Sequence, residues 1–271
     1  DTDYEIMLVR ANEASETVTF HTEPEPITLN VRDFGAFGDG VHDDTSAIQA
    51  AILCCPKNAR VLIPKGTYPV TALFLKSDMI MELQENAVLA GIYDRARTPI
   101  LPGQIEYDNE DGYYNLGSWE GNPIDSFASM ITGIHVKNVT ICGKGVLDGR
   151  ADFENWWSRP KDKIRAWRPR MIFLNHCENI TVVGVTVQNS PAWNLHPYFS
   201  NQIRFLDMEV KGPANSHNTD GCDPESCTNV EIAGVHFSVG DDCIAIKSGK
   251  IYMGKKFKVP SKHIHIRQSW M

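Results

Sequence analysis

Three aspartates toward the end of the sequence are the residues best placed to do chemistry. Asp220 lies in the phrase Asn218-Thr-Asp-Gly, and Asp241 and Asp242 lie in Gly240-Asp-Asp. Because Asp220 and Asp242 are 22 residues apart, a fold that repeats at that spacing would gather all three acids on one patch. Acids that close cannot all ionise cheaply, so one of them is expected to have a raised pKa and to keep its proton near neutrality. A protonated acid beside carboxylates that activate water is the equipment for glycoside hydrolysis.

The sequence contains a repeat that could position these acids. The segment that begins Ser129-Met-Ile-Thr-Gly-Ile-His is matched by the one that begins Arg170-Met-Ile-Phe-Leu-Asn-His. The pattern returns further along, and its apolar anchor recurs at spacings of 41, 23, 27 and 34 residues, at Val139, Ile180, Ile203, Val230 and Ile264. Polar insertions at 150–169 and 249–261 lengthen two of these spacings, so the underlying repeat is roughly two dozen residues.

A repeat of this length, made of short β-rich runs without a helical period, is typical of a β-solenoid. No turn can bury its own apolar face, so turns stacked about 4.8 Å apart complete the core. A β-sandwich would need hairpin turns such as Asn-Gly, which are scarce here. We therefore predict an all-β fold, a right-handed single-stranded parallel β-helix with Asp220 and Asp242 on adjacent turns. The alternative for the acids is that Asp-Gly and Gly-Asp-Asp serve only as turn residues.

The N-terminal region predicts a cap for this coil. Asp43 or Asp44 could N-cap a short amphipathic helix whose apolar stripe is Ala47, Ile48, Ala51 and Ile52. Such a helix would seal the open end of the solenoid. Two alternating strands and a proline-containing linker precede it, and two strands alone make no domain. We interpret residues 1–28 as the remnant of a fibronectin type III-like module with its linker, and residues 29–271 as the β-helix domain.

Bulk composition narrows the class of protein. A net charge of −8 argues against a nucleic-acid binder, and no apolar run is long enough for a membrane span. The N-terminus lacks the basic and apolar regions of a signal peptide. The seven cysteines are an odd number, and several lie in or beside apolar strand-like runs: Cys142, Cys177, Cys222 and Cys243. This placement favours buried free thiols over a disulfide framework and leaves the compartment open.

These motifs resemble those of a known enzyme family. Asn218-Thr-Asp-Gly, Gly240-Asp-Asp and Ser190-Pro-Ala-Trp are similar to motifs of glycoside hydrolase family 28, the polygalacturonases. Asp33-Phe-Gly-Ala-Phe-Gly-Asp-Gly is similar to the start of pectinase β-helices. The resemblance covers residues 29–271, and the insertions look most like those of bacterial exo-polygalacturonases. It implies a pectin-lyase-like coil that hydrolyses α-1,4-galacturonosidic bonds of pectin with inversion.

The resemblance also implies roles for single residues. Asp241 would protonate the glycosidic oxygen, Asp220 and Asp242 would hold and deprotonate the attacking water, and Asn218 would position the substrate or Asp220. The carboxyl groups should then lie in the inverting range, about 6.5–9.5 Å apart. No metal and no cofactor is implied. The family's Gly-His-Gly and Arg-Ile-Lys motifs are absent from the 271 residues, so we expect a catalytic domain incomplete at its C-terminus and activity from a longer protein.

A galacturonate polymer is a polyanion, so binding to this acidic protein requires a local positive patch. After Asp242 the sequence has no acidic residue but many basic ones: Lys247, Lys250, Lys255, Lys256, Lys258, Lys262, His263, His265 and Arg267. Lys247 is the best candidate for substrate binding because it follows Gly240-Asp-Asp closely. The alternative is a solvated basic loop. His196 and His217 are weaker candidates, since a lone His is more often a structural hydrogen-bonder.

Aromatic residues suggest how the groove ends. We predict that Trp193 packs on the coil and does not stack on a sugar. Two insertions rich in aromatic side chains could wall one end of a groove and restrict cleavage to chain ends, which is the basis for a hypothesis of exo-action. Their aromatic residues are Tyr107, Tyr113, Tyr114, Trp119, Phe153, Trp156, Trp157 and Trp167.

Other functions fit parts of the pattern. A rhamnogalacturonan or xylogalacturonan hydrolase could use the same three acids. A pectate lyase would need calcium and an Arg as base, and the sequence places no clear Arg beside the acids. A non-catalytic polysaccharide-binding coil would tolerate Asp241→Asn. The family resemblance suggests a secreted or periplasmic enzyme, and the cytoplasm stays open for one that trims oligosaccharides.

Overall fold

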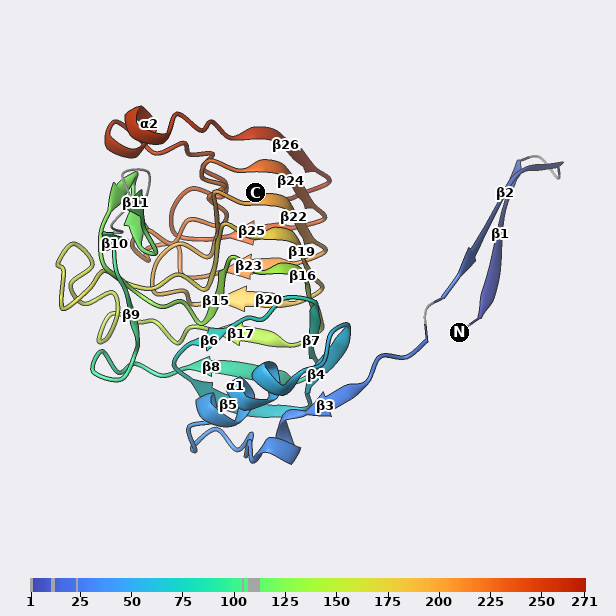
Figure 1. The fold of residues 1–271 in the computed structure, drawn as a ribbon, viewed down its shortest axis with the longest axis horizontal. Coiled ribbons are helices and arrows are strands. Elements are labelled where there is room, and N and C mark those ends of the chain that lie inside the picture. The colour runs from blue at the N-terminus through green and yellow to red at the C-terminus, as the bar shows by residue number, and fades with distance from the viewer. Residues whose placement is uncertain (1, 11–12, 23, 104, 107–112) are drawn as a thin grey trace.

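The computed structural model, which describes residues 2–10, 13–22, 24–103, 105–106 and 113–271, is a parallel β-helix (Figure 1). Three parallel sheets run along the coil, and successive turns of the chain add strands to each of them in sequence order. The predicted solenoid is therefore confirmed. No described helix is long and apolar enough to cross a membrane.

The strands divide among the three sheets as follows. The first sheet holds β3 (Thr28–Asn30), β4 (Ala59–Ile63), β7 (Met79–Leu83), β16 (Lys137–Gly143), β19 (Glu178–Val183), β22 (Asn201–Leu206), β24 (Thr228–Ala233) and β26 (Lys262–Arg267). The second holds β5 (Gly66–Val70), β8 (Ala87–Gly91), β17 (Val146–Asp148), β20 (Thr186–Gln188), β23 (Glu209–Lys211) and β25 (His236–Ser238). The third holds β6 (Leu73–Phe74), β15 (Ile131–Ile134), β18 (Ile172–Asn175) and β21 (Leu195–Tyr198).

The repeat read from the sequence is the register of the first sheet. Val139 pairs with Ile180, Ile180 with Ile203, and Ile203 with Val230. Val230 pairs in turn with Ile264. Burial alternates along β4 and β7, because every second side chain of a strand points into the coil. Stacked aliphatic side chains therefore fill the interior from turn to turn.

Asparagine occupies the same left-handed position on three turns of the coil, and Gln202 occupies it on the turn between the last two. Asn138, Asn179 and Asn229 have φ of 55°, 54° and 56°, in the left-handed region that Asn tolerates better than most residues. The Asn179 side-chain amide donates to the Asn138 Oδ1 over 2.9 Å. Local conformation and stacking therefore explain why the repeated phrase carries Asn just before its apolar anchor.

The ends of the coil carry the remaining elements. The predicted capping helix is α1 (Thr45–Cys54), which follows the 3₁₀ helix η1 (Val31–Phe34), and Ile48, Ala51 and Ile52 join the hydrophobic core. Asp44 holds the N-cap position, but its carboxylate accepts from the Phe37 and Gly38 amides, while Asp43 accepts from the Thr45 amide. The helix α2 (Tyr252–Phe257) lies at the opposite end (Figure 1).

Shorter antiparallel pairs complete the described secondary structure. In the first insertion they are β9 (Ile100–Leu101) with β14 (Ser126–Phe127), β10 (Ile105–Glu106) with β11 (Tyr113–Tyr114), and β12 (Ser118–Trp119) with β13 (Asn122–Pro123). At the N-terminus β1 (Asp3–Arg10) and β2 (Glu13–His21) form a hairpin outside the coil (Figure 1). Its assignment to a fibronectin type III-like module stays a prediction. All seven cysteines are free thiols, as expected, and Cys55, Cys177, Cys222 and Cys227 are buried. The expectation of burial is wrong for Cys142 and Cys243, which are partly exposed; Cys142 alternates with the buried Ile141 along β16 and so points away from the core.

Candidate active site

The coil brings the three predicted aspartates together on neighbouring turns. Parallel bridges join Leu195 to Cys222 and Cys222 to Ile244, so residues 22 apart lie in register here. The Gly221 amide donates to the Asp242 carbonyl over 2.8 Å, which places Asp242 directly on the turn above Asp220. The spacing in the sequence therefore predicted this stacking correctly.

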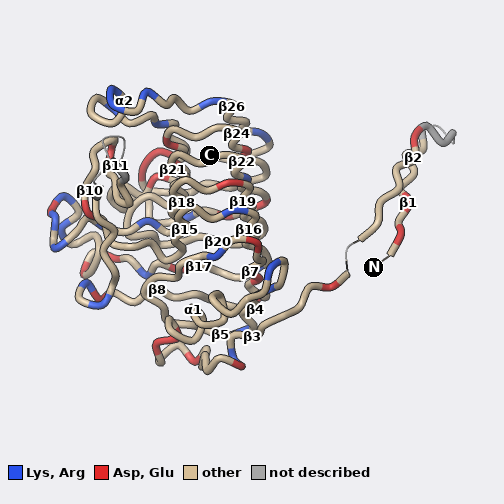
Figure 2. Tube along the Cα trace, in the orientation of Figure 1, with Lys and Arg blue, Asp and Glu red and all other residues tan. Residues whose placement is uncertain are grey.

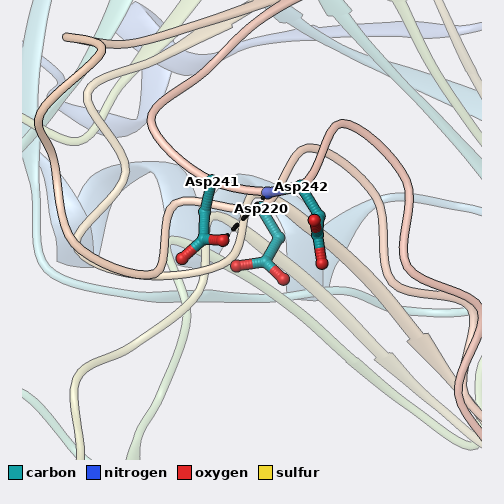
Figure 3. Close-up of side chains that lie close together, drawn as sticks. All are labelled: Asp220, Asp241 and Asp242. Atoms are coloured by element: carbon teal, nitrogen blue, oxygen red, sulfur yellow. Dashed lines mark hydrogen bonds between the residues drawn. The ribbon is translucent and has the colours of Figure 1, made fainter.

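The carboxylates themselves form one cluster (Figure 3). One oxygen from each of Asp220, Asp241 and Asp242 lies within 4.8 Å of the others. Asp220 is buried, Asp241 and Asp242 are exposed, and the Asp242 amide donates to Asp241 Oδ1 over 3.1 Å. The expected separation of about 6.5–9.5 Å refers to whole carboxyl groups, so this distance between single oxygens does not test it, and it stays a prediction.

Burial gives one acid of the cluster a raised pKa, as predicted, but it is Asp220. The pKa of Asp220 rises from 3.8 to about 6, chiefly because its carboxylate is buried. The nearby Lys247 ammonium opposes this rise, whereas the charges of Asp241 and Asp242 add to it. Asp220, which has the raised pKa, is one of the two residues that the family resemblance assigns to the attacking water. The residue that it assigns as the general acid, Asp241, has an oxygen within 4.8 Å of Asp220.

Lys247 lies under the cluster and turns inward. Its Nζ is 3.7 Å from Asp220 Oδ2, 3.0 Å from Asp223 Oδ1 and 4.6 Å from the centre of the Trp193 ring. Its side chain is 23% exposed. The pKa of Lys247 is raised, because Asp223 and Asp220 outweigh the effect of burial, which acts in the opposite direction. Lys247 is therefore part of the acid cluster's charge balance and also accessible enough to meet a ligand.

Asn218 is held by a buried arginine. Arg168 Nη2 donates to Asn218 Oδ1 over 2.7 Å, and Arg168 Nη1 donates to the carbonyls of Pro191 and His217 over 2.7 and 2.8 Å. Since the Asn218 Oδ1 is engaged, its amide N–H groups are the part that can meet a substrate.

Arg168 is an arginine next to the Asn218-Thr-Asp-Gly motif, but its hydrogen-bond partners are Asn218 and two carbonyls, and none of them is one of the three aspartates. Burial lowers the pKa of Arg168 to about 10, so the guanidinium stays protonated near neutrality. It acts as a hydrogen-bond donor to Asn218 and to two backbone carbonyls, and a base would have to be neutral. Arg168 and Asn218 are 50 residues apart, which is also the offset from Ile172 through Leu195 to Cys222, so the two residues lie in register two turns apart.

The two histidine candidates differ. His196 is fully buried, its Nε2 lies 3.1 Å from Glu225 Oε2, and burial lowers its pKa to about 4. A substrate cannot reach this ring, so the expectation of substrate binding by His196 is wrong. His217 is exposed, lies next to Asn218, and packs edge-on against Phe153 with ring centres 6.4 Å apart. It remains a candidate ligand.

A stack of indoles joins both insertions to the coil beside the acids. Trp193 is 2% exposed, as the packing interpretation requires, and Trp119 stacks on it with ring centres 4.8 Å apart. Trp119 also stacks on Trp167, at 5.8 Å. The buried Arg170 guanidinium lies 5.2 Å from the ring centres of both Trp119 and Trp193. This arrangement fixes a wall next to the site.

Trp156 and Trp157 of the second insertion lie outside that wall. Trp156 and Trp157 are buried in a separate cluster with Phe127, so they form the core of the insertions. Tyr113 and Tyr114 are the residues of β11. Tyr107 lies outside the described residues.

The basic stretch after Asp242 divides between two surfaces. Lys250, Lys255 and Lys256 line a surface pocket of about 600 Å³, and Lys250 pairs with Glu120 over 2.9 Å. Figure 2 shows these basic residues over α2. His265 and Arg267 line a different pocket on the outer face of the first sheet. Neither pocket is lined by any of the three aspartates, so of the basic residues named here it is Lys247 that contacts the acid cluster.

Sequence reasoning missed four buried charged residues around the site, namely Arg168, Arg170, Asp223 and Glu225. The available signal was their alternation with proline, in Arg168-Pro-Arg and Asp223-Pro-Glu. The first pair adjoins the repeated phrase that begins at Arg170, and the second follows Asn218-Thr-Asp-Gly closely. As for metals, the three aspartates form a group of carboxylates close enough to share a divalent cation, although acid–base hydrolysis requires none.

Comparisons with known proteins agree with this geometry. The profile "Glycosyl hydrolases family 28" matches residues 100–260, and the profile "Rhamnogalacturonase A/epimerase, pectate lyase-like" matches residues 28–91. A probable polygalacturonase of Vitis vinifera is 32% identical over 87% of this chain and 47% of its own length. An exo-poly-alpha-D-galacturonosidase of Dickeya chrysanthemi is 28% identical over 87% of this chain and 44% of its own length. The chain thus spans about half the length of the curated relatives it matches.

Solved structures show the same coil. An exopolygalacturonase of Thermotoga maritima superposes with a TM-score of 0.75 at 27% identity, over 91% of this chain and 62% of its own. A family 28 exopolygalacturonase of Yersinia enterocolitica superposes with a TM-score of 0.73 at 26% identity, over 90% of this chain and 50% of its own. All three aspartates fall inside the stretch that the first profile matches.

Proposed function

The chain belongs to glycosyl hydrolases family 28, and from this premise we propose that the protein hydrolyses α-1,4-galacturonosidic bonds of polygalacturonate with inversion, from the chain end. The observation that carries the proposal is the cluster of Asp220, Asp241 and Asp242, whose oxygens lie within 4.8 Å of one another on adjacent turns. Three carboxylates in one cluster supply both an acid and the acceptors for a water molecule.

The proposed reaction assigns one task to each carboxylate. Asp241, exposed at the rim of the cluster, gives its proton to the glycosidic oxygen as the bond to the anomeric carbon breaks. A water molecule held by Asp220 and Asp242 attacks that carbon from the opposite face and passes its proton to one of these two acids. Protons and bonds balance: one water is consumed and one new reducing end appears.

The pKa of Asp220 supports its role toward the water. A carboxylate whose pKa is raised to about 6 is a stronger base than an ordinary aspartate, and it can accept a proton only when it is ionised, above that pH. We therefore expect the rate to rise with pH up to about 6.

The wall of indoles supports exo-action. Trp119 and Trp167 come from two insertions, and Trp119 stacks on both Trp167 and Trp193. Lys247 Nζ joins this stack to the acids, 4.6 Å from the Trp193 ring and 3.7 Å from Asp220. A fixed wall at one end of a groove blocks a continuous polymer and admits a chain end. Two of the similar structures are titled exopolygalacturonases, whereas endo-polygalacturonases of Pectobacterium are also among the relatives, so the product pattern decides this point.

The direct test is digestion of polygalacturonate by the full-length protein. Hydrolysis predicts new reducing ends without ultraviolet absorbance from unsaturated uronides, and no loss of rate when a chelator is added. Unsaturated products that disappear with the chelator would assign a lyase instead. Digestion of rhamnogalacturonan and xylogalacturonan in parallel separates the closest alternative substrates. A secreted or periplasmic location remains part of the proposal, to be tested by fractionation of the producing cells.

A further inference from the structure

Asp223 is a buried carboxylate that the proposed reaction does not use. Its side chain is fully buried, Oδ1 forms an ion pair with Lys247 Nζ at 3.0 Å, and neither carboxylate oxygen accepts a hydrogen bond from any described residue. Burial raises the pKa of Asp223 well above its usual range, and the charge of Asp220 adds to this effect. A buried acid with one short partner costs several kcal/mol unless that partner compensates it, so its presence requires an explanation.

The coil itself does not need an acid at this position. The bridges that join Leu195, Cys222 and Ile244 place Asp223 between His196 and Ala245 of the neighbouring turns. The backbone amide of Asp223 donates to the Leu195 carbonyl over 2.8 Å whatever its side chain is. An imidazole and a methyl group occupy the stacked positions, so stacking alone would accept a neutral residue here.

Lys247 connects Asp223 to the catalytic cluster. Its Nζ lies between the two acids, 3.0 Å from Asp223 Oδ1 and 3.7 Å from Asp220 Oδ2, over the Trp193 ring. A lysine side chain has four rotatable bonds and reaches a fixed place only when something holds its ammonium group. The shorter contact, to Asp223, is the one that holds it. The charged groups that face Asp223 are Lys247, Asp220 and Arg170.

We propose that Asp223 is a positioning residue, which holds the Lys247 ammonium group beneath Asp220 so that the catalytic cluster keeps one fixed positive charge. The proposal rests on the proposed hydrolase function. The fixed charge offsets part of the repulsion among three carboxylates at the step in which Asp220 must accept a proton from water. Asp223 thus acts on the reaction through Lys247, without touching substrate.

A double-mutant cycle with Asp223→Asn and Lys247→Met tests this pathway in the full-length protein. Asp223→Asn is expected to lower kcat about ten-fold and to leave KM within about two-fold. In the Lys247→Met background, Asp223→Asn should lower kcat no further, because its intermediary is already gone. Effects that multiply, or an unchanged kcat in Asp223→Asn, would overturn the proposal.

A matched control is Asp44→Asn, which neutralises a buried carboxylate at the other end of the coil, where it accepts from the Phe37 and Gly38 amides. Asp44→Asn is expected to lower thermal stability without changing kcat. Combined with Lys247→Met, it should leave the kcat of that variant unchanged. Equal kcat losses in Asp44→Asn and Asp223→Asn would reduce Asp223 to a structural role.

Amine labelling gives a readout that does not depend on activity. Because Asp223 raises the pKa of Lys247, acetic anhydride should modify Lys247 faster in Asp223→Asn than in the wild type, with the exposed Lys262 as internal reference in mass spectra. Should the variant not fold, the wild-type Lys247 alone is informative: a pKa at or below 10.5 would overturn the proposal. If the wild type fails to hydrolyse polygalacturonate but this labelling difference appears, the proposed function fails and the positioning contact stands.

Discussion

The buried charge of Asp220 should destabilise the folded protein at neutral pH, and Asp220→Asn should remove that cost. The pKa of Asp220 rises from 3.8 to about 6 on folding, so folding favours its protonated form. The protonated carboxyl is present in both states below pH 3.8, and the cost of ionisation grows as the pH rises from there through 6. A pKa difference of that size corresponds to about 3 kcal/mol at pH 7.5.

The assay is unfolding of the wild type and Asp220→Asn by denaturant and by heat at pH values between 4 and 8. The variant should match the wild type near pH 4 and exceed it by up to about 3 kcal/mol at pH 7.5, which is roughly 6–12 °C in Tm for a domain of this size. Asp242→Asn, which replaces an exposed carboxylate of the same cluster, is the control and should change stability by less than about 0.5 kcal/mol.

A pH-independent difference between the two proteins would refute this reasoning, and so would a variant that is less stable at pH 7.5. The first result would mean that Asp220 does not titrate with a raised pKa. The second would mean that contacts of its ionised form with Lys247 outweigh burial. A gain in stability with loss of activity would show that the site keeps a costly charge for function.

Three further predictions follow from the site. The rate of hydrolysis should fall about ten-fold for each pH unit below pH 6, because Asp220 is then protonated and can no longer accept a proton from the water; a rate that stays constant between pH 6 and 4 would contradict this. Arg168→Lys should raise KM about ten-fold with kcat within three-fold, since it frees the Asn218 amide, whereas the exposed Arg165→Lys should change neither. Early digests by the wild type should contain one short product, and Trp119→Ala should add a ladder of longer ones by loosening the wall; a ladder from the wild type would refute exo-action.

The coil and its register could be predicted because their signals are local. The turns carry matching apolar anchors, and three of them carry an asparagine suited to left-handed backbone just before the anchor, so Val139, Ile180 and Ile203 align without any knowledge of the interior. The stacking of Asp220 and Asp242 follows from the same period. The distance between their oxygens did not follow, because it depends on side-chain direction at the edge of the third sheet.

The supporting charges could not be predicted for a different reason. Arg168 meets Asn218 across 50 residues, and Lys247 meets Asp223 across 24. Bridges from Leu195 to Cys222 and from Cys222 to Ile244 bring these segments into register, but register does not tell which polar side chains turn toward one another. His196 was a candidate for substrate binding, but its ring is buried, because Trp193 and Phe173 pack against it. Only the placement of the insertions over the third sheet decides which polar residues of that sheet are covered.

The central claim is that Asp220, Asp241 and Asp242 act as one unit, and the rates of their single and double Asn variants on polygalacturonate test it most directly. Each single variant of the full-length protein should lose about two to four decades of rate while remaining folded, and each double variant should be no slower than its slower parent. Any single variant that retains more than about a tenth of the wild-type rate, or losses that multiply in the doubles, would contradict the account.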